Sequence, residues 1–172
     1  MLAKEAYERY APPMTICCYL DSPVGRLALE ADGETLTGVR WASAREEATE
    51  RATNVRPSPV LKEARRQLER YFAGRLKAFD LPLAAQGTPF QKSVWKMMRE
   101  IPYGETATYG GIAMALASGP RAVGTACGRN PIPIIVPCHR VLGSGGSEGG
   151  FSGGQGLPTK RKLLALEGVV LL

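Results

Sequence analysis

Apolar and β-branched residues gather in three short stretches near the start of the chain, at residues 15–20, 26–31 and 35–41. Polar turn sequences separate them, DSPVG at 21–25 and ADGE at 31–34. Runs of this length, bounded by Gly, Pro, Asp and Ser, are typical of strands that are joined by tight turns. The pattern predicts an antiparallel meander of three strands.

Helical patterns follow the predicted strands. Residues 44–53 and 59–72 are expected to form helices, the second ending before Gly74. This first half contains no group of residues that indicates chemistry, so we expect a small α+β unit that supports the second half. Residues 81–87 are predicted to be a linker.

The sequence Thr88-Pro89-Phe90-Gln91 predicts the start of a helix. Thr88 can cap it, Pro89 suits the first helical position, and Gln91 can complete a capping box. The apolar residues that recur at helical spacing, and so predict the buried face, are Phe90, Val94, Met97 or Met98, and Ile101. Trp95 is expected in the core rather than as a stacking platform. Residues 102–104, Pro-Tyr-Gly, end the helix.

Two more helices are predicted at 109–117, with Thr108 as its cap, and at 121–129. Tyr109, Ile112, Ala113 and Leu116 form an apolar stripe on the first of them. The short connection at 118–120, Ser-Gly-Pro, separates the two helices. Two short helices joined by a tight turn that contains glycine indicate a helix-turn-helix.

The helix at 121–129 carries two arginines with small residues between them. The residues expected to face outward are Arg121, Ala122, Thr125 and Arg129, whereas Val123 and Ala126 face inward. Such a helix can approach another surface closely while its arginines reach phosphates or bases. Close packing within the protein would also require small residues, and the pattern does not separate these two interpretations.

The stretch at 130–141 holds the only histidine of the chain, His139, directly after Cys138. Its apolar β-branched run predicts a short strand buried against the core. Its prolines argue against a helix and against a central position in a sheet. We expect Cys138 at the rim of the core. From these residues alone, Cys138 is either an activated nucleophile or a small buried hydrophobe.

A glycine- and serine-rich loop covers residues 143–156, and a last helix is predicted at 158–167. A loop of this length within a domain is usually a binding loop or disordered. Its glycines do not fit a phosphate-binding motif. In the last helix Lys160, Arg161 and Lys162 are expected to be exposed, and Leu163, Leu164 and Leu166 to be packed.

Composition narrows the class of protein. The 172 residues suffice for one or two domains, and 44% hydrophobic with 22% charged residues is typical of a soluble globular chain. No apolar run approaches the ~18 residues of a membrane span. Residues 1–13 lack the apolar centre of a signal peptide. We therefore expect a cytoplasmic protein without a membrane partner.

Cysteine usage and charge add two expectations. Four cysteines in a reducing compartment are expected to be thiols, and no pair or histidine cluster has the spacing of a zinc site, so no metal is expected. The net charge of +6 and the pI of 9.3 favour a polyanionic partner such as nucleic acid. A basic surface that only keeps the protein in solution is the alternative.

Taken in order, the motifs of residues 88–168 resemble those of the O6-alkylguanine-DNA alkyltransferases, the methylated-DNA–protein-cysteine methyltransferases. The most specific is Pro137-Cys138-His139-Arg140-Val141 with Arg121-Ala122-Val123-Gly124 upstream. The other similar segments are Phe90-Gln91, Val94-Trp95, Ile101 to Thr106, Thr108-Tyr109, Asn130-Pro131, Phe151 to Gly154 and Leu163 to Gly168. The first half is similar only through 22–25 and 71–74.

The resemblance implies a catalytic group around Cys138. Cys138 would accept the alkyl group by in-line displacement, and His139 would take the thiol proton through a water. Glu167 would polarise His139, although a solvated acid at a helix end is the alternative. Asn130 would hold the turn that presents the cysteine, or be a simple turn residue.

The resemblance also implies how DNA is bound. A base within a duplex must be flipped out to reach a buried thiol. Arg121 would fill the vacated position in the stack, and Tyr109 would rotate the 3′ phosphate and donate to the guanine. Small residues would face the minor groove, which is ~6 Å wide. The residues expected to contact the groove or the base are Ala122, Gly124, Val141, Phe151 and Ser152.

The implied organisation is an α+β protein with two domains. Residues 1–86 would form a ribonuclease-H-like supporting domain, with a small antiparallel sheet and helix. Residues 87–172 would form a mainly helical domain with the helix-turn-helix and the acceptor cysteine. The expected partner is double-stranded DNA that contains O6-alkylguanine, with O4-alkylthymine as a further candidate. No cofactor is expected, and the protein is expected to be a monomer.

Two rival functions remain as alternatives to alkyl transfer. A lesion sensor would bind alkylated DNA without reacting, and a cysteine hydrolase would turn over an ester or peptide. The presence of Cys138 argues against a purely binding role.

Phe151 stands where many relatives have tyrosine, so a hydroxyl is lost while the ring face is kept. The connection at 118–120 is short, which affects the expected angle of the next helix.

Overall fold

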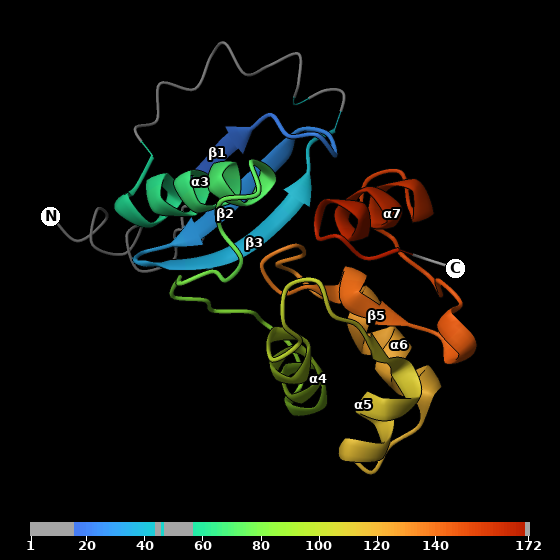
Figure 1. Cartoon of the computed structure of the whole chain (residues 1–172). Helices are drawn as coiled ribbons and strands as arrows, with labels where there is room; N and C mark the ends of the chain where they lie inside the picture. Colours follow the sequence, from blue (N-terminus) through green and yellow to red (C-terminus); the bar gives the residue numbers. More distant parts are fainter. Residues whose placement is uncertain (1–15, 44–45, 47–56, 171–172) are drawn as a thin grey trace, which may run out of the picture.

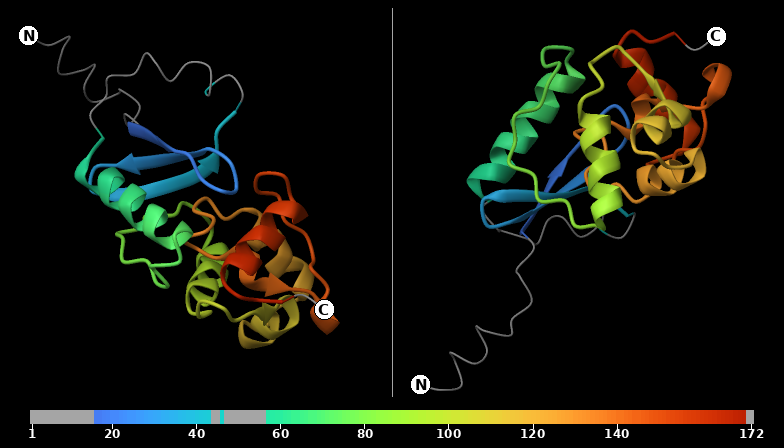
Figure 2. Two further views of the ribbon diagram at one scale, coloured as in Figure 1. Left: turned by 45° about the horizontal axis from the view of Figure 1, so that its top comes forward. Right: turned by 90° about the horizontal axis from the view of Figure 1, so that it is seen from below.

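The computed structural model describes residues 16–43, 46 and 57–170. Two parts lie side by side, a three-stranded sheet with one long helix and a group of shorter helices (Figures 1 and 2). The α+β class predicted from the sequence is confirmed, with sheet and helix first and a mainly helical part second. The helix expected at 44–53 lies outside the described residues, except for Glu46.

The sheet is an antiparallel meander, as the turn sequences predict. Its strands follow the order of the chain: β1 (Ile16–Leu20), β2 (Leu27–Asp32) and β3 (Thr35–Trp41). Leu29 of β2 lies opposite Cys18 on one side and Val39 on the other, and all three side chains are buried. These three paired residues share one face of the sheet and supply part of its core.

Helix α3 (Pro59–Phe72) covers one face of this sheet and has the predicted bounds (Figure 1). Ser58 caps its first turn by accepting from the Leu61 amide, and Pro59 occupies the first position. Gly74, with φ +69°, lies just beyond its end, in a backbone conformation that suits glycine. The helix buries an apolar stripe that ends at Tyr71.

The segment at 81–87 is more than a linker. The Leu36 amide donates to the Pro82 carbonyl at 2.8 Å, and the Ala84 amide donates to the Leu36 carbonyl at 2.9 Å. These bonds pair the segment with β3, which extends the sheet by an isolated parallel bridge. The sequence shows no strand pattern here because the pairing depends on the position of β3.

Helix α4 (Pro89–Arg99) begins with the predicted capping box between Thr88 and Gln91. Its buried face includes Val94 and Met98, as helical spacing predicts. Trp95 lies in the core, as expected, and its indole N–H donates to the Ala126 carbonyl at 2.9 Å. The indole thus ties α4 to the helix that carries Ala126.

The predicted helix-turn-helix consists of α5 (Tyr109–Ala115) and α6 (Pro120–Gly128). On α6, Val123 and Ala126 are buried, while the four residues predicted to face outward are exposed: Arg121, Ala122, Thr125 and Arg129. Helix α5 ends two residues earlier than predicted, and α6 both starts and ends one residue earlier than predicted. The short connection is accommodated by Ala117, whose φ is +47°.

The strand predicted within 130–141 is wrong. Residues 132–136 form a compact buried turn, closed by a bond from the Val136 amide to the Ile132 carbonyl at 2.9 Å. Ile134 has φ +75°, which is rare for a β-branched residue and incompatible with a strand. The side chains of the apolar run are buried, and its only β-type pairing in the described chain is an isolated bridge between Pro133 and Val136. A strand forms only after it, at Val141–Leu142 (β5), which lies parallel to Ala107–Thr108 (β4).

Helix α7 (Leu157–Leu166) is the last helix of the described chain, and Glu167 is its C-cap. The expectation that Lys160 is exposed is wrong, because its side chain is completely buried. Lys160 lies on the same helical face as Leu163 and Leu164, three and four residues later, and this face packs inward. Arg161 and Lys162 are exposed, as expected.

Candidate active site

Cys138 lies at the rim of the core and faces a large cavity. It opens a single 3-10 turn, Cys138–Arg140, after Pro137 has adopted an inverse γ-turn with φ −83° and ψ 70°. Pro137 and His139 are buried, whereas Cys138 is half-buried and lines a cavity of about 1180 Å³. The thiol is therefore open to a ligand on one side only. Cys138 is a free thiol, as are Cys18 and Cys127.

The cavity is enclosed by both halves of the chain. From the second half, Tyr109, Arg121, Gly124, Asn130, Phe151 and Ser152 line it together with Cys138. From the first half, the lining comes mainly from β3 and includes Thr37, Arg40 and Trp41. Of the residues expected around a bound base, Ala122 and Val141 are not part of this lining.

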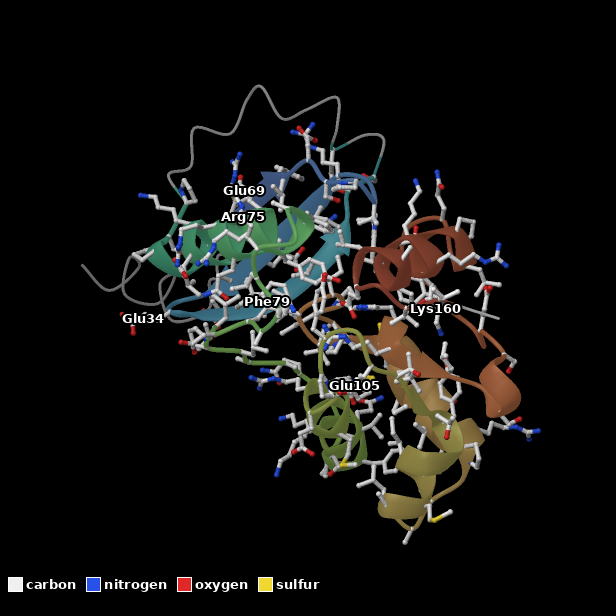
Figure 3. The ribbon with its side chains drawn as sticks, in the orientation of Figure 1. Glu34, Glu69, Arg75, Phe79, Glu105 and Lys160 are labelled. Carbon is white, nitrogen blue, oxygen red and sulfur yellow. The ribbon has the colours of Figure 1, made fainter. Side chains whose placement is uncertain are left out.

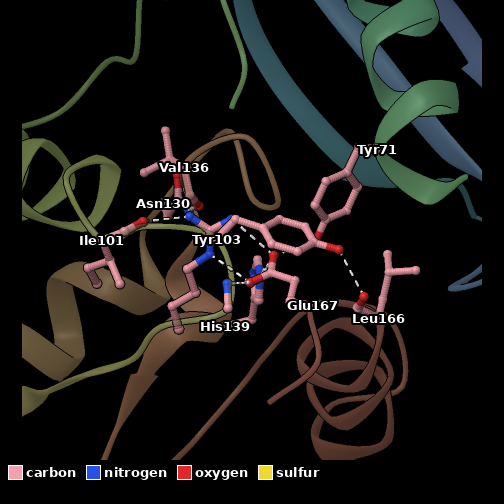
Figure 4. Close-up of polar contacts among 10 residues, drawn as sticks. Tyr71, Ile101, Tyr103, Asn130, Val136, His139, Leu166 and Glu167 are labelled. Carbon is pink, nitrogen blue, oxygen red and sulfur yellow. Dashed lines mark hydrogen bonds and ion pairs between the residues drawn. The ribbon is translucent and has the colours of Figure 1, made fainter. Parts of the chain in front are cut away.

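Behind the thiol, His139 forms a buried pair with Glu167. The distance from His139 Nε2 to Glu167 Oε1 is 2.8 Å, and both side chains are inaccessible to solvent (Figure 4). Because a carboxylate can only accept, Nε2 carries the proton and Nδ1 keeps a free lone pair. Among the described residues, Nδ1 has no hydrogen-bond partner. Burial lowers the pKa of His139, so the imidazole is neutral and able to take a proton.

Glu167 is held by four side-chain hydrogen bonds. Arg140 donates to it through Nε at 2.8 Å and Nη2 at 3.0 Å, and the Tyr71 hydroxyl donates at 2.6 Å. Burial alone would raise the pKa of this carboxyl, but the bonds from His139 and Arg140 outweigh it and hold the pKa at about 2. Glu167 is therefore a fixed anion, and the interpretation as a solvated helix end is wrong.

Asn130 fixes the turn that leads to the cysteine. Its side-chain Nδ2 donates to the Val136 carbonyl at 2.7 Å, and its Oδ1 accepts from the Ile132 amide at 3.0 Å (Figure 4). Burial raises the pKa of the Cys138 thiol, and a hydrogen bond from Asn130 and the charge of Lys160 act in the opposite direction. The resting thiol is thus protonated and requires a base before it can react.

Tyr109 lies at the first position of α5 and lines the cavity. Thr108 caps this helix, and β4 holds the preceding residues against β5. The Tyr109 hydroxyl donates to the Gly150 carbonyl at 3.3 Å. Burial raises the pKa of Tyr109 to about 12, so the hydroxyl remains a donor at neutral pH. A side chain at Gly149 would come within 2.7 Å of the ring, so this loop needs glycine there.

Lys160 is a residue of the site that the sequence interpretation missed. Its Nζ donates to the Val141 carbonyl at 2.6 Å and to the Glu148 carbonyl, between α7 and β5 (Figure 3). Burial lowers the pKa of this ammonium. The sequence did contain a signal for its burial, because Lys160 precedes the buried Leu163 and Leu164 by three and four residues and so shares their helical face. Lys160 connects the glycine-rich loop to the turn that contains Cys138.

Two aromatic residues of the first half also reach the site. Trp41 lies edge-on to Phe151, with ring centroids 6.2 Å apart, and its indole donates to the Val24 carbonyl. Tyr71 reaches Glu167 across 96 positions of sequence. The first half is therefore not only a support, and no short-range pattern could have indicated these contacts.

The described ranges contain no group of side chains that could hold a metal ion and no helix that could cross a membrane. No three His, Cys, Asp or Glu side chains there lie close enough to hold a metal ion. None of the helices in those ranges is long and apolar enough to cross a membrane.

Family models match almost the whole chain. The model described as 6-O-methylguanine DNA methyltransferase, DNA binding domain, matches residues 89–169. The model of the ribonuclease-like domain of the same family matches residues 15–85.

Relatives and solved structures agree with these models. A methylated-DNA–protein-cysteine methyltransferase of Methanosarcina acetivorans is 49% identical over 150 residues, which is 86% of this chain and 95% of the relative. One of Haemophilus influenzae is 43% identical, over 87% of this chain and 84% of the relative. The crystal structure of Mycobacterium tuberculosis O6-methylguanine methyltransferase has a TM-score of 0.74 and 42% identity, covering 90% and 93% of the two chains. A structure of the M. tuberculosis protein in complex with DNA has a TM-score of 0.74 and 47% identity, with 87% and 90% covered.

Proposed function

The chain belongs to the O6-methylguanine DNA methyltransferase family, and on this premise we propose that it moves the alkyl group of O6-alkylguanine in DNA onto Cys138. One observation carries the proposal. Cys138, which precedes the single histidine of the sequence, lines a large cavity, and a buried carboxylate is bonded to the imidazole of that histidine. DNA repair by an alkyltransferase is the function of the family.

The chemistry follows from the protonation states of the site. His139 takes the thiol proton at its free Nδ1, through a water, while Glu167 stabilises the imidazolium that forms. Cys138 Sγ then attacks the alkyl carbon in line. The S–C bond forms, the C–O6 bond breaks, and the electron pair stays on guanine, which takes up one proton. The product thioether does not hydrolyse, so each molecule acts once and needs no cofactor.

Access to the base requires that it leave the helix. In the proposed complex α6 lies against the minor groove, Ala122 and Gly124 allow close approach, and Arg121 fills the vacated position in the stack. Tyr109 rotates the 3′ phosphate and donates to the guanine. The exposure of Arg121 and Ala122 and the position of Tyr109 in the lining of the cavity support this arrangement.

Contacts to the flipped base come from the loop and from β5. Phe151 and Ser152 line the cavity and would contact the base directly. Val141 does not itself line the cavity, but its carbonyl has one lone pair engaged by Lys160 and a second lone pair that would serve the base. O4-alkylthymine is a second substrate class for the same displacement.

The division of the chain is part of the proposal. Residues 1–86 would form the supporting domain, and residues 87–172 the domain that binds DNA and accepts the alkyl group. The family models, which meet between residues 85 and 89, support this boundary. The proposed active species is a monomer on double-stranded DNA that carries the lesion.

The test is transfer of label. Duplex DNA that contains O6-methylguanine, labelled on the methyl carbon, is mixed with protein under reducing conditions. We expect one label per protein molecule for the wild type and none for Cys138→Ser. Tight binding without any label on the wild type would contradict transfer and favour a lesion sensor.

A further inference from the structure

A tyrosine of the first half completes the buried group behind Cys138. Tyr71 lies near the end of α3 and is completely buried, and its hydroxyl donates to Glu167 Oε1 at 2.6 Å (Figure 4). Its ring is fixed by Phe72 and Phe79, each with a centroid separation of 5.3 Å. The hydroxyl is therefore not needed to position the ring.

The Oε1 atom of Glu167 is shared. His139 Nε2 donates to it at 2.8 Å, Arg140 Nη2 at 3.0 Å, and the Tyr71 hydroxyl makes the shortest of the three contacts. An oxygen with two lone pairs cannot serve three donors at full strength. Tyr71 thus competes directly with His139 for the same atom.

We propose that Tyr71 is a positioning residue of the transfer reaction, through which the first half of the chain weakens the hold of Glu167 on His139. The inference rests on the proposed function, because it assigns a role in that reaction. It goes beyond the group Cys138, His139 and Glu167. One residue that sets the basicity of the His139 imidazole would lie in the other half of the chain.

The effect has a definite sign. The charged groups that face His139 are Glu167, Arg140 and Lys160, and burial lowers the pKa of the imidazole. Burial and the neighbouring Glu167 raise the pKa of Tyr71 far above its usual value, so Tyr71 stays neutral and acts only as a donor. A donor on Oε1 reduces the negative charge available to His139. Removal of that donor therefore makes the imidazole more basic. As the pH is lowered, His139 then becomes protonated at a higher pH than in the wild type, and the protonated imidazole cannot act as a base.

A matched control lies in the same aromatic group. Tyr103 is in edge contact with Tyr71, at 6.1 Å between centroids, and its hydroxyl donates to the Leu166 carbonyl at 2.9 Å instead of to the carboxylate. Tyr103→Phe removes one hydroxyl from the same region without freeing Oε1. A merely structural role of Tyr71 predicts that Tyr71→Phe and Tyr103→Phe behave alike.

The experiment uses the fact that the chain has one histidine. The full chain, produced without a histidine tag and with 15N-labelled histidine, gives signals from one imidazole. In Tyr71→Phe we expect the Nε2–H proton to move downfield at neutral pH, because its bond to Glu167 strengthens. We also expect the acid limb of the transfer rate to move upward by roughly 0.5 pH unit. Both should keep their wild-type values in Tyr103→Phe.

Identical imidazole signals and identical acid limbs in Tyr71→Phe and Tyr103→Phe would overturn the role of Tyr71. Failure of the proposed function has a different appearance, since the wild type itself would then leave DNA unchanged. The imidazole signals would still test the influence of Tyr71 on His139 in that event, because they do not depend on transfer.

Discussion

The relay cluster, made of Tyr71, His139, Arg140 and Glu167, differs sharply from the α6 surface, made of Arg121, Ala122 and Gly124. Every member of the relay cluster is buried, and the carboxylate of Glu167 accepts from the other three. On the α6 surface Arg121 and Ala122 are exposed, and Gly124 borders the cavity.

Under the proposed function, the relay cluster would serve the chemistry and the α6 surface would serve the recognition of DNA. Buried charges hold one geometry only when each has its partners, and loss of one partner leaves another charge uncompensated. Exposed residues can be changed with little effect on folding. We therefore expect changes in the relay cluster to reduce both stability and transfer, and changes on the α6 surface to reduce transfer from duplex DNA alone.

Glu167→Gln is expected to have the largest effect. The buried guanidinium of Arg140 would lose its counter-charge, which costs about 3–5 kcal/mol of the free energy of unfolding. Urea unfolding measures this loss, and the transfer rate should fall with it at concentrations where the protein is still folded. A Glu167→Gln variant as stable as the wild type would contradict the claim that the relay cluster contributes to stability while the α6 surface does not.

The contribution of the Glu167 carboxylate to the free energy of unfolding should also be measurable in the wild type, as a loss of stability at low pH. The pKa of Glu167 is about 2 in the folded chain, against 4.5 as its ordinary value. A depressed pKa contributes stability above the unfolded pKa, and this contribution is lost as the pH falls from about 4.5 through about 2. The difference corresponds to about 3 kcal/mol. Urea unfolding as a function of pH should show this loss in the wild type and a flatter curve in Glu167→Gln.

Lys160→Met should have a smaller effect, and it sharpens the comparison because Lys160 is a buried charge outside the relay cluster. The Val141 and Glu148 carbonyls would lose a buried charged donor, at a cost of about 2 kcal/mol in unfolding. Lys162→Met, an exposed neighbour on the same helix, is the control and should change stability by less than about 0.5 kcal/mol. Equal effects of the two changes would indicate that Lys160 is not held as described.

Arg121→Ala should have the smallest effect on folding, within about 0.5 kcal/mol. Transfer from duplex DNA should fall by about tenfold, which corresponds to about 1.4 kcal/mol, because the vacated stack position is no longer filled. Arg129→Ala, at the exposed end of the same helix, is the control for loss of charge. Binding assays on intact and alkylated duplex complete the test: equal losses of affinity on the two would contradict a role in flipping.

Local signals predicted much of the fold. The turn sequences indicated the meander, and the cap predicted at Thr88 coincides with a helix start, because such signals act within three or four residues. The outward and inward faces of α6 followed from helical spacing in the same way. The Pro137-to-Val141 motif indicated where the site lies.

Non-local contacts account for what the sequence did not predict. The run at 132–136 has the composition of a strand, but the side chain of Asn130 and the positive φ of Ile134 fold it into a turn. Tyr71 meets Glu167 only because the two halves of the chain pack together. Neither contact leaves a pattern within a window of sequence.

Tandem mass spectrometry of the protein after reaction with an equimolar amount of O6-methylguanine duplex tests the central claim most directly. We predict one added methyl group on Cys138 and none on Cys18 or Cys127, with guanine restored in the DNA. Restored guanine with an unmodified Cys138, or a methyl group on another cysteine, would contradict the assignment of this thiol as the acceptor.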